Sequence, residues 1–249
     1  MEVRLIIDPP ALGRMNMAID EALLESASRG ETILRFYSWS PATLSLGYFQ
    51  AYDDRRAHLA SADLDVVRRS TGGGAIVHDQ EITYSFVTPI AGRFSADHQQ
   101  LVRAFHETLC ESLANWQISA NLYKVPPSGT TQTRQPSNQS FLCFQRREID
   151  DVVLGEAKIA GSAQRRRRNS LLQHGSVLLA KSSHAPELAG IGNFAKHLSK
   201  ATLIDTWTSN IATRLGARFV RGEVNDRERQ LAESHVINRY GAVAWQRRR

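Results

Sequence analysis

Two residues with nucleophilic or activating chemistry, Cys143 and Lys158, lie 15 positions apart in the sequence. A thiol with an ordinary pKa of about 8.5 is mostly protonated at neutral pH, and an adjacent ammonium group favours the nucleophilic thiolate. Each residue also has a structural interpretation, because a cysteine between Leu142 and Phe144 is commonly a small core side chain and an edge-strand lysine opposes aggregation. Chemistry at Cys143 therefore requires that a turn between two short strands brings the two side chains together.

Three consecutive glycines are the second feature with chemical potential, because backbone without side chains exposes its N–H groups to a ligand. They lie between two short apolar runs, in the segment RRSTGGGAIVHD at residues 68–79. Two arginines precede the glycines and a His–Asp pair follows them, a combination that suits a carboxylate, a thioester carbonyl or a phosphate. The glycines alone are equally typical of a hairpin with exposed charges.

Two further segments combine small and polar residues, KIAGSAQ at 158–164 and QHGS at 173–176. A lysine at the head of a run of small residues can extend over a ligand held by glycine-rich backbone. His78 and His174 border the special segments, and each can orient a carbonyl group, transfer a proton or serve as a hydrogen-bonded structural residue. We favour positioning over acid–base catalysis for both. Cys110 lies in an amphipathic helix and is interpreted as a core residue.

The elements that must position these residues follow from hydrophobic periodicity and from the Gly and Pro breaks. We expect strands at 3–7, 32–39, 43–49, 82–87, 141–144, 151–154, 158–163 and 170–179. We expect helices at 14–28, 53–62, 97–117, 205–216 and 223–240. In the first helix, Asn16, Asp20 and Glu21 fall on the polar face, and the strand at 82–87 alternates as if one of its faces were buried.

The Pro-, Ser- and Gly-rich segment Pro126–Ser140 has no periodicity and is interpreted as a mobile loop. The remaining order, in which groups of consecutive strands alternate with helices, predicts an α+β fold around a mixed, mainly antiparallel sheet. The last expected helix runs almost to residue 249, so we expect one domain over residues 1–249.

The composition is that of an ordinary globular protein, with 249 residues of which 42% are hydrophobic and 22% charged. Two cysteines exclude a disulfide framework, and no Cys/His spacing indicates a zinc site. The first residues do not form a signal peptide, and the longest apolar runs are too short to span a membrane. We therefore expect a cytoplasmic protein without a metal site or a membrane partner.

The net charge of +6 is concentrated in arginine clusters at 146–147, 165–168 and 247–249. Such clusters favour an acidic partner, either a nucleic acid or an acidic protein. A solvated arginine face is an equally simple interpretation, above all for the run at 247–249.

Taken together, these segments resemble the motifs of one known family. Residues 68–79 resemble the RRxTGGGAVxHD signature of the lipoate–protein ligase A and octanoyltransferase family, and KIAGSAQ with LQHGS at 172–176 resembles its second motif, KIxGSAQ…LQHGS. Supporting similarity at 16–22, 45–50 and 239–241 extends the resemblance over nearly the whole chain. It implies the catalytic fold of biotin and lipoate ligases, with a mixed sheet flanked by helices and no C-terminal accessory domain.

The resemblance also implies a bound octanoate or lipoate chain and assigns residues to its site. Cys143 and Lys158 are the expected catalytic residues. The expected acyl-binding residues come from the two motifs: Arg69, Thr71, Gly72, Gly73, Gly74, Ala75, His78, Gly161, Ser162, Ala163, His174 and Gly175.

The family contains several reactions. Its transferases move octanoate from a carrier to a lysine without a cofactor, its ligases make an acyl adenylate with ATP and magnesium, and its amidotransferases move the acyl group between lipoyl proteins. Cys143–Phe144 matches the Cys–Phe pair of cysteine-dependent transferases of the LipM type, which favours a transferase. In those enzymes a Pro–Ser pair commonly follows, whereas Gln145–Arg146–Arg147 stands here, so the acyl donor is left open.

The resemblance implies protein partners. The expected donor is acyl carrier protein, and the expected acceptors are lipoyl domains of 2-oxoacid dehydrogenases or the glycine cleavage H protein. Because these partners are typically acidic, we expect residues 165–168 to steer one of them to the site. The alternative from another class is a non-catalytic acyl- or nucleic-acid-binding protein that uses the basic face, although no segment is left over for a DNA-binding module.

Overall fold

The computed structural model describes residues 1–90, 98–125, 140–194 and 198–249. Within them, the main sheet has eight strands in the order β11-β1-β2-β6-β10-β9-β8-β7. Their bounds are β1 Glu2–Ile7, β2 Ile33–Tyr37, β6 Glu81–Pro89, β7 Asn121–Leu122, β8 Val152–Leu154, β9 Ala157–Arg167, β10 Ser170–Leu178 and β11 Arg218–Arg221. The pairs β11–β1 and β1–β2 are parallel and the other pairs antiparallel. The predicted mixed, mainly antiparallel sheet is confirmed.

A second, smaller sheet carries the glycine segment. Among the described residues it has three strands in the order β4-β3-β5, with β3 at Thr43–Leu46, β4 at Asp65–Arg68 and β5 at Ile76–His78. β3 pairs in parallel with β4 and antiparallel with β5. The chain between β4 and β5 is therefore a turn that crosses the end of β3, and residues 69–75 form it. We call this segment the glycine turn.

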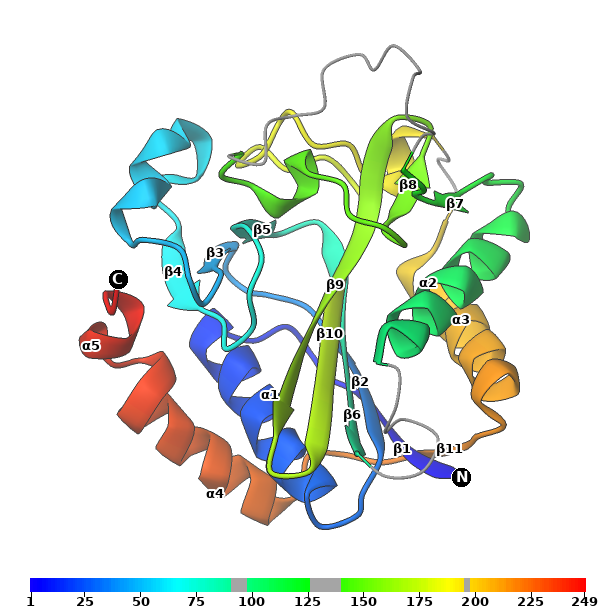
Figure 1. Ribbon diagram of the computed structural model, residues 1–249, viewed down its shortest axis with the longest axis horizontal. Coiled ribbons are helices and arrows are strands. Elements are labelled where there is room, and N and C mark those ends of the chain that lie inside the picture. Colours follow the sequence, from blue (N-terminus) through cyan, green and yellow to red (C-terminus); the bar gives the residue numbers. More distant parts are fainter. Residues whose placement is uncertain (91–97, 126–139, 195–197) are drawn as a thin grey trace.

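Helices cover both faces of the main sheet (Figure 1). On one face, α1 (Gly13–Ala27) packs against α4 (Asp226–His235), and on the other α2 (His98–Ala114) packs against α3 (Lys200–Leu215). A π-helical turn, Val236–Tyr240, and a short helix, α5 (Val243–Gln246), follow α4.

The central strand β6 is buried on both faces, so the expectation of one buried face is wrong. Tyr84 stacks on Phe105 of α2, with ring centroids 5.0 Å apart, and meets Trp207 of α3 edge-on. On the opposite face, Val87 belongs to the apolar cluster with α1. Ser85 on that face is also buried and donates to Asp20 of α1. The alternation in β6 therefore separates an apolar face from a partly polar one, and both faces are buried.

The polar face of α1 is also buried, because it packs against the sheet and the C-terminal helices. Asn16, Asp20 and Glu21 are almost fully inaccessible to solvent. They meet charged and polar partners from the sheet and from the C-terminal helices, which replace the hydrogen bonds of water. This buried polar layer lies next to the candidate site.

Other expectations need correction. The segment 141–144 is not a strand: Leu142 makes an isolated bridge to Ala75, and a 3₁₀ helix follows at Cys143–Gln145. The helix expected at 53–62 is two short 3₁₀ helices, Asp53–Ala57 and Leu59–Ser61. β11 was not foreseen because three of its four residues are exposed and two are arginines. Residues 126–139 of the expected loop lie outside the described residues.

Candidate active site

A cavity of about 360 Å³ lies between the glycine turn, the β9–β10 pair and the 3₁₀ helix Cys143–Gln145. Its volume is in the range of small-molecule sites. Most of the residues expected from the sequence line it, namely Arg69, Gly72, Gly73, Gly74, His78, Cys143, Lys158, Gly161, Ser162, Ala163, His174 and Gly175. Thr71 and Ala75 belong to the glycine turn but do not line the cavity. The fold thus brings together residues from segments far apart in sequence.

Cys143 is held directly against the glycine turn. Its backbone N–H donates to Ala75 O at 2.7 Å, and Ala75 N–H donates to Phe141 O at 2.9 Å. A Cβ atom on Gly74 would lie 2.9 Å from the nitrogen of Cys143, so only glycine permits this approach. Gly73 has φ +92°, a conformation that favours glycine, and its Cβ position lies 3.9 Å from the sulfur.

Lys158, on β9, places its ammonium group beside Cys143. The Nζ–Sγ distance is 3.9 Å, and Nζ lies 2.6 Å from Oδ2 of Asp151. Burial lowers the pKa of Lys158, but the negative charges of Cys143 and Asp151 outweigh burial and raise this pKa above its ordinary value. Lys158 is therefore a buried ammonium group at neutral pH, poised between a sulfur and a carboxylate.

Asp151 is a site residue that sequence reasoning missed. Its Oδ2 also accepts the backbone N–H of Glu148 at 2.6 Å, which fixes the carboxylate in place. Asp151 lies at the end of the turn before β8, and the register between β8 and β9 shifts at Val152/Val153. An isolated carboxylate at the start of an expected strand carries no pattern, so no sequence signal distinguishes it.

Gly161 makes room for the lysine. A Cβ atom on Gly161 would lie 2.7 Å from Cε of Lys158 and 3.0 Å from Oδ1 of Asp151. The side chain of Lys158 thus lies along its own strand, over a glycine three residues onward. This explains why a small residue occupies this position of the KIAGSAQ segment.

Arg69 is buried and acts on the backbone of the glycine turn. One Nη atom donates to the carbonyl and hydroxyl of Ser45, and the other donates to Gly72 O at 3.0 Å and Gly74 O at 2.9 Å. Burial, only partly opposed by the charge of Cys143, lowers the pKa of Arg69 to about 10. The guanidinium therefore determines the shape of the turn, and its contact with a ligand stays a prediction.

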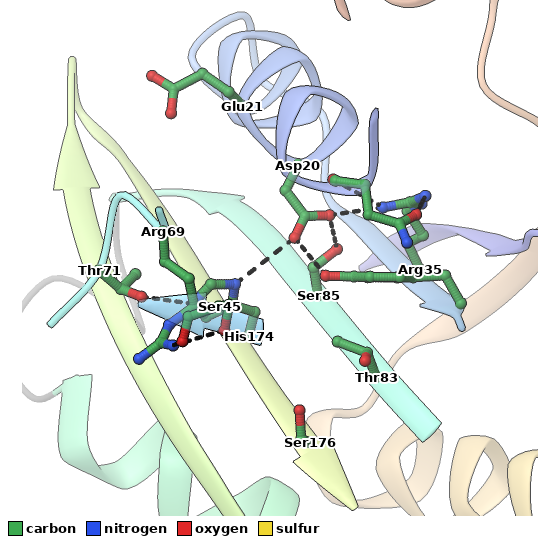
Figure 2. Close-up of polar contacts among 12 residues, drawn as sticks. Asp20, Glu21, Arg35, Ser45, Arg69, Thr71, Thr83, Ser85, His174 and Ser176 are labelled. Atoms are coloured by element: carbon green, nitrogen blue, oxygen red, sulfur yellow. Dashed lines mark hydrogen bonds and ion pairs between the residues drawn. The ribbon is translucent and has the colours of Figure 1, made fainter. Parts of the chain in front are cut away.

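His174 connects the glycine turn to α1 (Figure 2). Its Nε2 lies 2.7 Å from Oγ1 of Thr71, and its Nδ1 lies 3.6 Å from Oδ2 of Asp20. Because a carboxylate faces Nδ1, this nitrogen carries the hydrogen, and Nε2 accepts from the hydroxyl of Thr71. His174 thus positions the turn from behind.

Asp20 is the centre of this buried polar layer. Its Oδ1 accepts from Arg35 at 2.9 Å and from Ser85 at 2.8 Å, and its Oδ2 accepts from Tyr37 at 2.8 Å. Burial raises the pKa of Asp20, but His174 and Arg35 outweigh it and hold this pKa below its ordinary value. Sequence reasoning placed Asp20 on the polar face of the first helix and did not assign it to the site, although it lies in the supporting motif at 16–22.

The side chain of His78 is buried and surrounded by protein partners. Its ring stacks on Trp39 with centroids 3.8 Å apart, while Nδ1 meets Glu81 and Nε2 meets Ser45, both at 2.7 Å. Burial lowers the pKa of His78, although Glu81 opposes this. Both ring nitrogens have protein partners, which fits a residue that positions β3 and β5 at the cavity wall.

A further buried histidine, His106 of α2, was also missed. Its Nδ1 donates to Asp150 O at 2.5 Å, and its Nε2 accepts from Ser162 at 2.6 Å. Tyr84 lies 2.7 Å from the same hydroxyl and accepts from Gln173. Burial lowers the pKa of His106, which keeps the ring neutral and able to accept. His106 therefore connects the turn before Asp151 to β9 by hydrogen bonds.

The two cysteines differ sharply. Cys110 of α2 packs against the core, and burial raises the pKa of its thiol to about 12, with Glu107 and Glu111 adding to the effect. The sequence interpretation of Cys110 as a core residue agrees with this position. Cys143 is thus the cysteine at the cavity.

Arg165 and Arg167 of the 165–168 cluster bind within the protein. Arg165 donates to Ser70 O at 3.2 Å, and Arg167 pairs with Glu21. Steering of a partner by this cluster stays a prediction. Within the described residues, no group of three metal-ligating side chains is present, and no helix has the length and apolar character needed to cross a membrane.

Comparisons with known proteins agree with these features. The family model described as "Lipoyl protein ligase A/B catalytic domain" matches residues 13–205. The chain is 31% identical to octanoyltransferase LipM of Brevibacillus brevis over 99% of both proteins. It is 32% identical to octanoyltransferase LipM of Kyrpidia tusciae, covering 99% of this chain and 98% of that protein.

Solved structures share the fold. A lipoate–protein ligase A bound with ATP superposes with a TM-score of 0.79 at 23% identity, covering 99% of this chain and 98% of that one. A bipartite lipoate protein ligase of Thermoplasma acidophilum, studied with its E2 lipoyl domain, has a TM-score of 0.77 at 22% identity and covers 99% and 96%. At this level of identity the likeness establishes the fold.

Proposed function

The chain belongs to the lipoyl protein ligase A/B catalytic-domain family, and we propose that it transfers an octanoyl group to a protein lysine through a thioester on Cys143. Its LipM relatives are octanoyltransferases, which supports octanoyl transfer in protein lipoylation. The observation that carries the proposal is the 3.9 Å approach of the Cys143 sulfur to the buried ammonium of Lys158. A ligase that forms an adenylate has no need of a sulfur at this point.

In the first step, the Cys143 thiolate attacks the carbonyl carbon of an octanoyl thioester. The new C–S bond forms, the old C–S bond breaks, and the donor thiolate takes up the proton that Cys143 gave up. Lys158 stabilises the attacking thiolate by its charge, which counts for more in a buried site than in water. One thioester replaces another, so no ATP is consumed.

Charge on the carbonyl oxygen needs hydrogen-bond donors in both steps. The N–H of Cys143 is already bonded to Ala75 O. The exposed backbone N–H groups of the glycine turn are the remaining candidates beside the sulfur, and Arg69 holds this turn in shape through Gly72 O and Gly74 O. We assign the oxyanion to this turn.

In the second step, the neutral amine of an acceptor lysine attacks the acyl-enzyme. An amide bond forms, the C–S bond breaks, and Cys143 leaves as a thiolate that Lys158 again stabilises. The amine releases its proton to solvent. Because an amide is more stable than a thioester, this step drives the transfer forward.

The cavity supports an apolar chain. Its lining includes the apolar and aromatic side chains of Met17, Tyr37, Trp39, Ile76 and Val102. These side chains form an apolar enclosure of the kind that binds an eight-carbon chain by burial of its methylenes. We propose that the octanoyl tail lies here, with its carbonyl at Cys143.

The partners follow from the reaction. We propose an acyl carrier protein as donor and a lipoyl domain of a 2-oxoacid dehydrogenase or the glycine cleavage H protein as acceptor. The solved neighbour studied with its E2 lipoyl domain supports an acceptor of this kind. The transfer as written requires no ATP or metal ion, whereas the alternative, an ATP-dependent ligase reaction in the same cavity, requires both.

The test is a transfer assay with octanoyl-acyl carrier protein and an unmodified lipoyl domain, without ATP and with EDTA. We expect octanoylated domain from the wild type and from Cys110→Ala, and none from Cys143→Ala. Modification that requires added ATP and lipoate or octanoate, and that survives in Cys143→Ala, would instead establish the ligase.

A further inference from the structure

A surface of aromatic rings and arginines begins at the rim of the cavity. The ring of Phe49 lies 3.9 Å from the Cβ position of the cavity residue Gly72, and its side chain is 67% exposed. Tyr48, next to it, donates its backbone N–H to Thr71 O at 2.8 Å. We call Tyr48, Phe49, Trp245, Arg248 and Arg249 the rim patch.

The guanidinium groups of the rim patch are held on aromatic faces. Arg248 lies 4.1 Å from the ring centroid of Tyr48 and 4.8 Å from that of Trp245, and Arg249 lies 5.3 Å from that of Phe49. A stacked guanidinium keeps its N–H edges free for planar anions such as carboxylates. Its conformation is also partly fixed in advance, which lowers the entropic cost of binding.

Arg68, the residue before the glycine turn, joins the segment around Tyr48 and Phe49 to α5. Its buried guanidinium donates to Gly47 O at 2.9 Å and Gln50 O at 2.7 Å, on either side of the two aromatic residues, and to Gln246 O at 2.8 Å. The indole N–H of Trp245 donates back to Arg68 O at 3.0 Å. Arg68, the first arginine of the motif, thus holds the two segments of the rim patch together beside the cavity.

The arginines of the rim patch differ from those of the 165–168 cluster in their ion pairs. In the part of the chain that the structure describes, no carboxylate forms an ion pair with Arg247, Arg248 or Arg249. Burial and then the charges of Arg248 and Arg249 lower the pKa of Arg68, a sign that like charges accumulate here. By contrast, Arg167 in the other cluster is paired with Glu21.

The geometry points to an occupant, and we propose that the rim patch docks the acidic acceptor domain by carboxylates that flank its lysine. This inference rests on the proposed function. A lysine reaches its target on a stem of only four carbons, so its domain must lie against the rim itself. A donor that carries its thioester on a longer, flexible arm has no such restriction. Charge complementarity fits either acidic partner, and the short reach of the lysine together with the continuity of the patch with Gly72 selects the acceptor.

The test separates the two half-reactions. Cys143 is loaded from a small donor, the octanoyl thioester of N-acetylcysteamine, and the acyl-enzyme is mixed with the acceptor domain at increasing concentrations. The variant is Arg248→Glu with Arg249→Glu. The matched control is Arg227→Glu with Arg229→Glu, which changes the charge equally at two exposed residues of α4.

We expect the patch variant to load at the wild-type rate and to transfer with a second-order rate constant about 10-fold or more lower at low salt, converging on the wild type at high salt. The control should stay within about twofold. Transfer that matches the control overturns the proposal. In a parallel loading reaction, octanoyl-acyl carrier protein replaces the small donor. A defect confined to that reaction also overturns the proposal, because it would make the donor the occupant.

Failure of the proposed function gives a different result from failure of the docking proposal. If the wild type forms no acyl-enzyme, the transferase assignment fails, and direct titration of the unmodified acceptor domain by calorimetry still decides the docking. Weaker binding to the patch variant than to the control supports the patch, and equal binding refutes it.

Discussion

Two polar clusters, one lining the cavity and one behind it, use buried charge in opposite ways. The first, which we call the catalytic wall, consists of Cys143, Lys158 and Asp151. The second, which we call the support wall, lies behind the cavity and consists of Asp20, Arg35, His174 and Thr71, of which His174 reaches the cavity (Figure 2). On the support wall, each charged group is committed to protein partners. On the catalytic wall, a sulfur faces an ammonium group across 3.9 Å and is bordered by bare backbone.

This difference indicates how the molecule divides its tasks. A polar layer in which every group is hydrogen-bonded makes the glycine turn in front of it rigid. An ammonium ion close to a sulfur instead stabilises the negative charge that the sulfur carries during the reaction. Changes on the catalytic wall should therefore affect the rate more than the stability, and changes on the support wall should do the reverse.

The largest effect is expected when the buried ion pair is removed as a unit. Lys158→Met with Asp151→Asn eliminates both charges at similar volume, so the free energy of unfolding should change by no more than about 1 kcal/mol. Octanoyl transfer should fall about 1,000-fold, or about 4 kcal/mol, because the thiolate loses its counterion. Urea unfolding and single-turnover rates measure the two quantities. A large loss of stability with a proportionate loss of rate would remove the distinction between the walls.

The next effect belongs to the support wall. Asp20→Asn removes the more deeply buried of the two carboxylates that pair with Arg35 and leaves only Asp8, so the free energy of unfolding should drop by about 3 kcal/mol at pH 7. In the folded protein the pKa of Asp20 is lowered, so its contribution is complete above its ordinary pKa and is lost as the pH falls through the folded value. The difference in the free energy of unfolding between wild type and variant should therefore become smaller as the pH falls. A gap that is constant from pH 7 to pH 3 would contradict the charged role of Asp20.

A smaller effect is expected for Asp151→Asn alone. Asparagine can still accept the N–H of Glu148 but no longer attracts the ammonium of Lys158, whose position at the sulfur then relaxes. The rate of alkylation of Cys143 by iodoacetamide should fall about 10-fold, which corresponds to about 1.4 kcal/mol. Asp150→Asn, in the adjacent position of the same turn, is the matched control. Equal effects of the two variants would show that Asp151 has no special part in holding Lys158.

The smallest effect is expected for Thr71→Val, which removes the hydroxyl bonded to His174 at constant shape. The loss of one hydrogen bond, about 1 kcal/mol, should slow transfer about fivefold through a looser glycine turn. Transfer at the wild-type rate would mean that His174 does not position the turn through Thr71.

The sequence predicted the parts of the site that form continuous segments. The glycine turn, β9 and β10 carry residues in regular spacing, and their approach to Cys143 at the cavity was anticipated. The mechanism of that approach was not, because a 3₁₀ helix holds Cys143 where a strand was expected. A three-residue turn bonded to Ala75 depends on tertiary contacts that periodicity does not record.

Single polar residues were beyond prediction for a related reason. His106 acts through Ser162, which is distant in sequence, and Asp151 acts through Lys158, which a turn brings beside it. Nothing in the local sequence around either residue separates it from a surface residue. Asp20 was misplaced because an amphipathic pattern cannot distinguish a solvated polar face from one that meets a buried Arg35. In physical terms, apolar burial leaves a pattern in sequence and pairwise electrostatics does not.

The central claim is that Cys143 carries the acyl group, and trapping of the intermediate tests it most directly. The protein is mixed with octanoyl-acyl carrier protein without ATP, quenched in acid within one turnover, and digested for peptide mass spectrometry. The account predicts an octanoyl group on the peptide with Cys143, labile to hydroxylamine and passed to the acceptor lysine on a chase. Productive transfer without any acyl group on Cys143 at any time point would contradict the account.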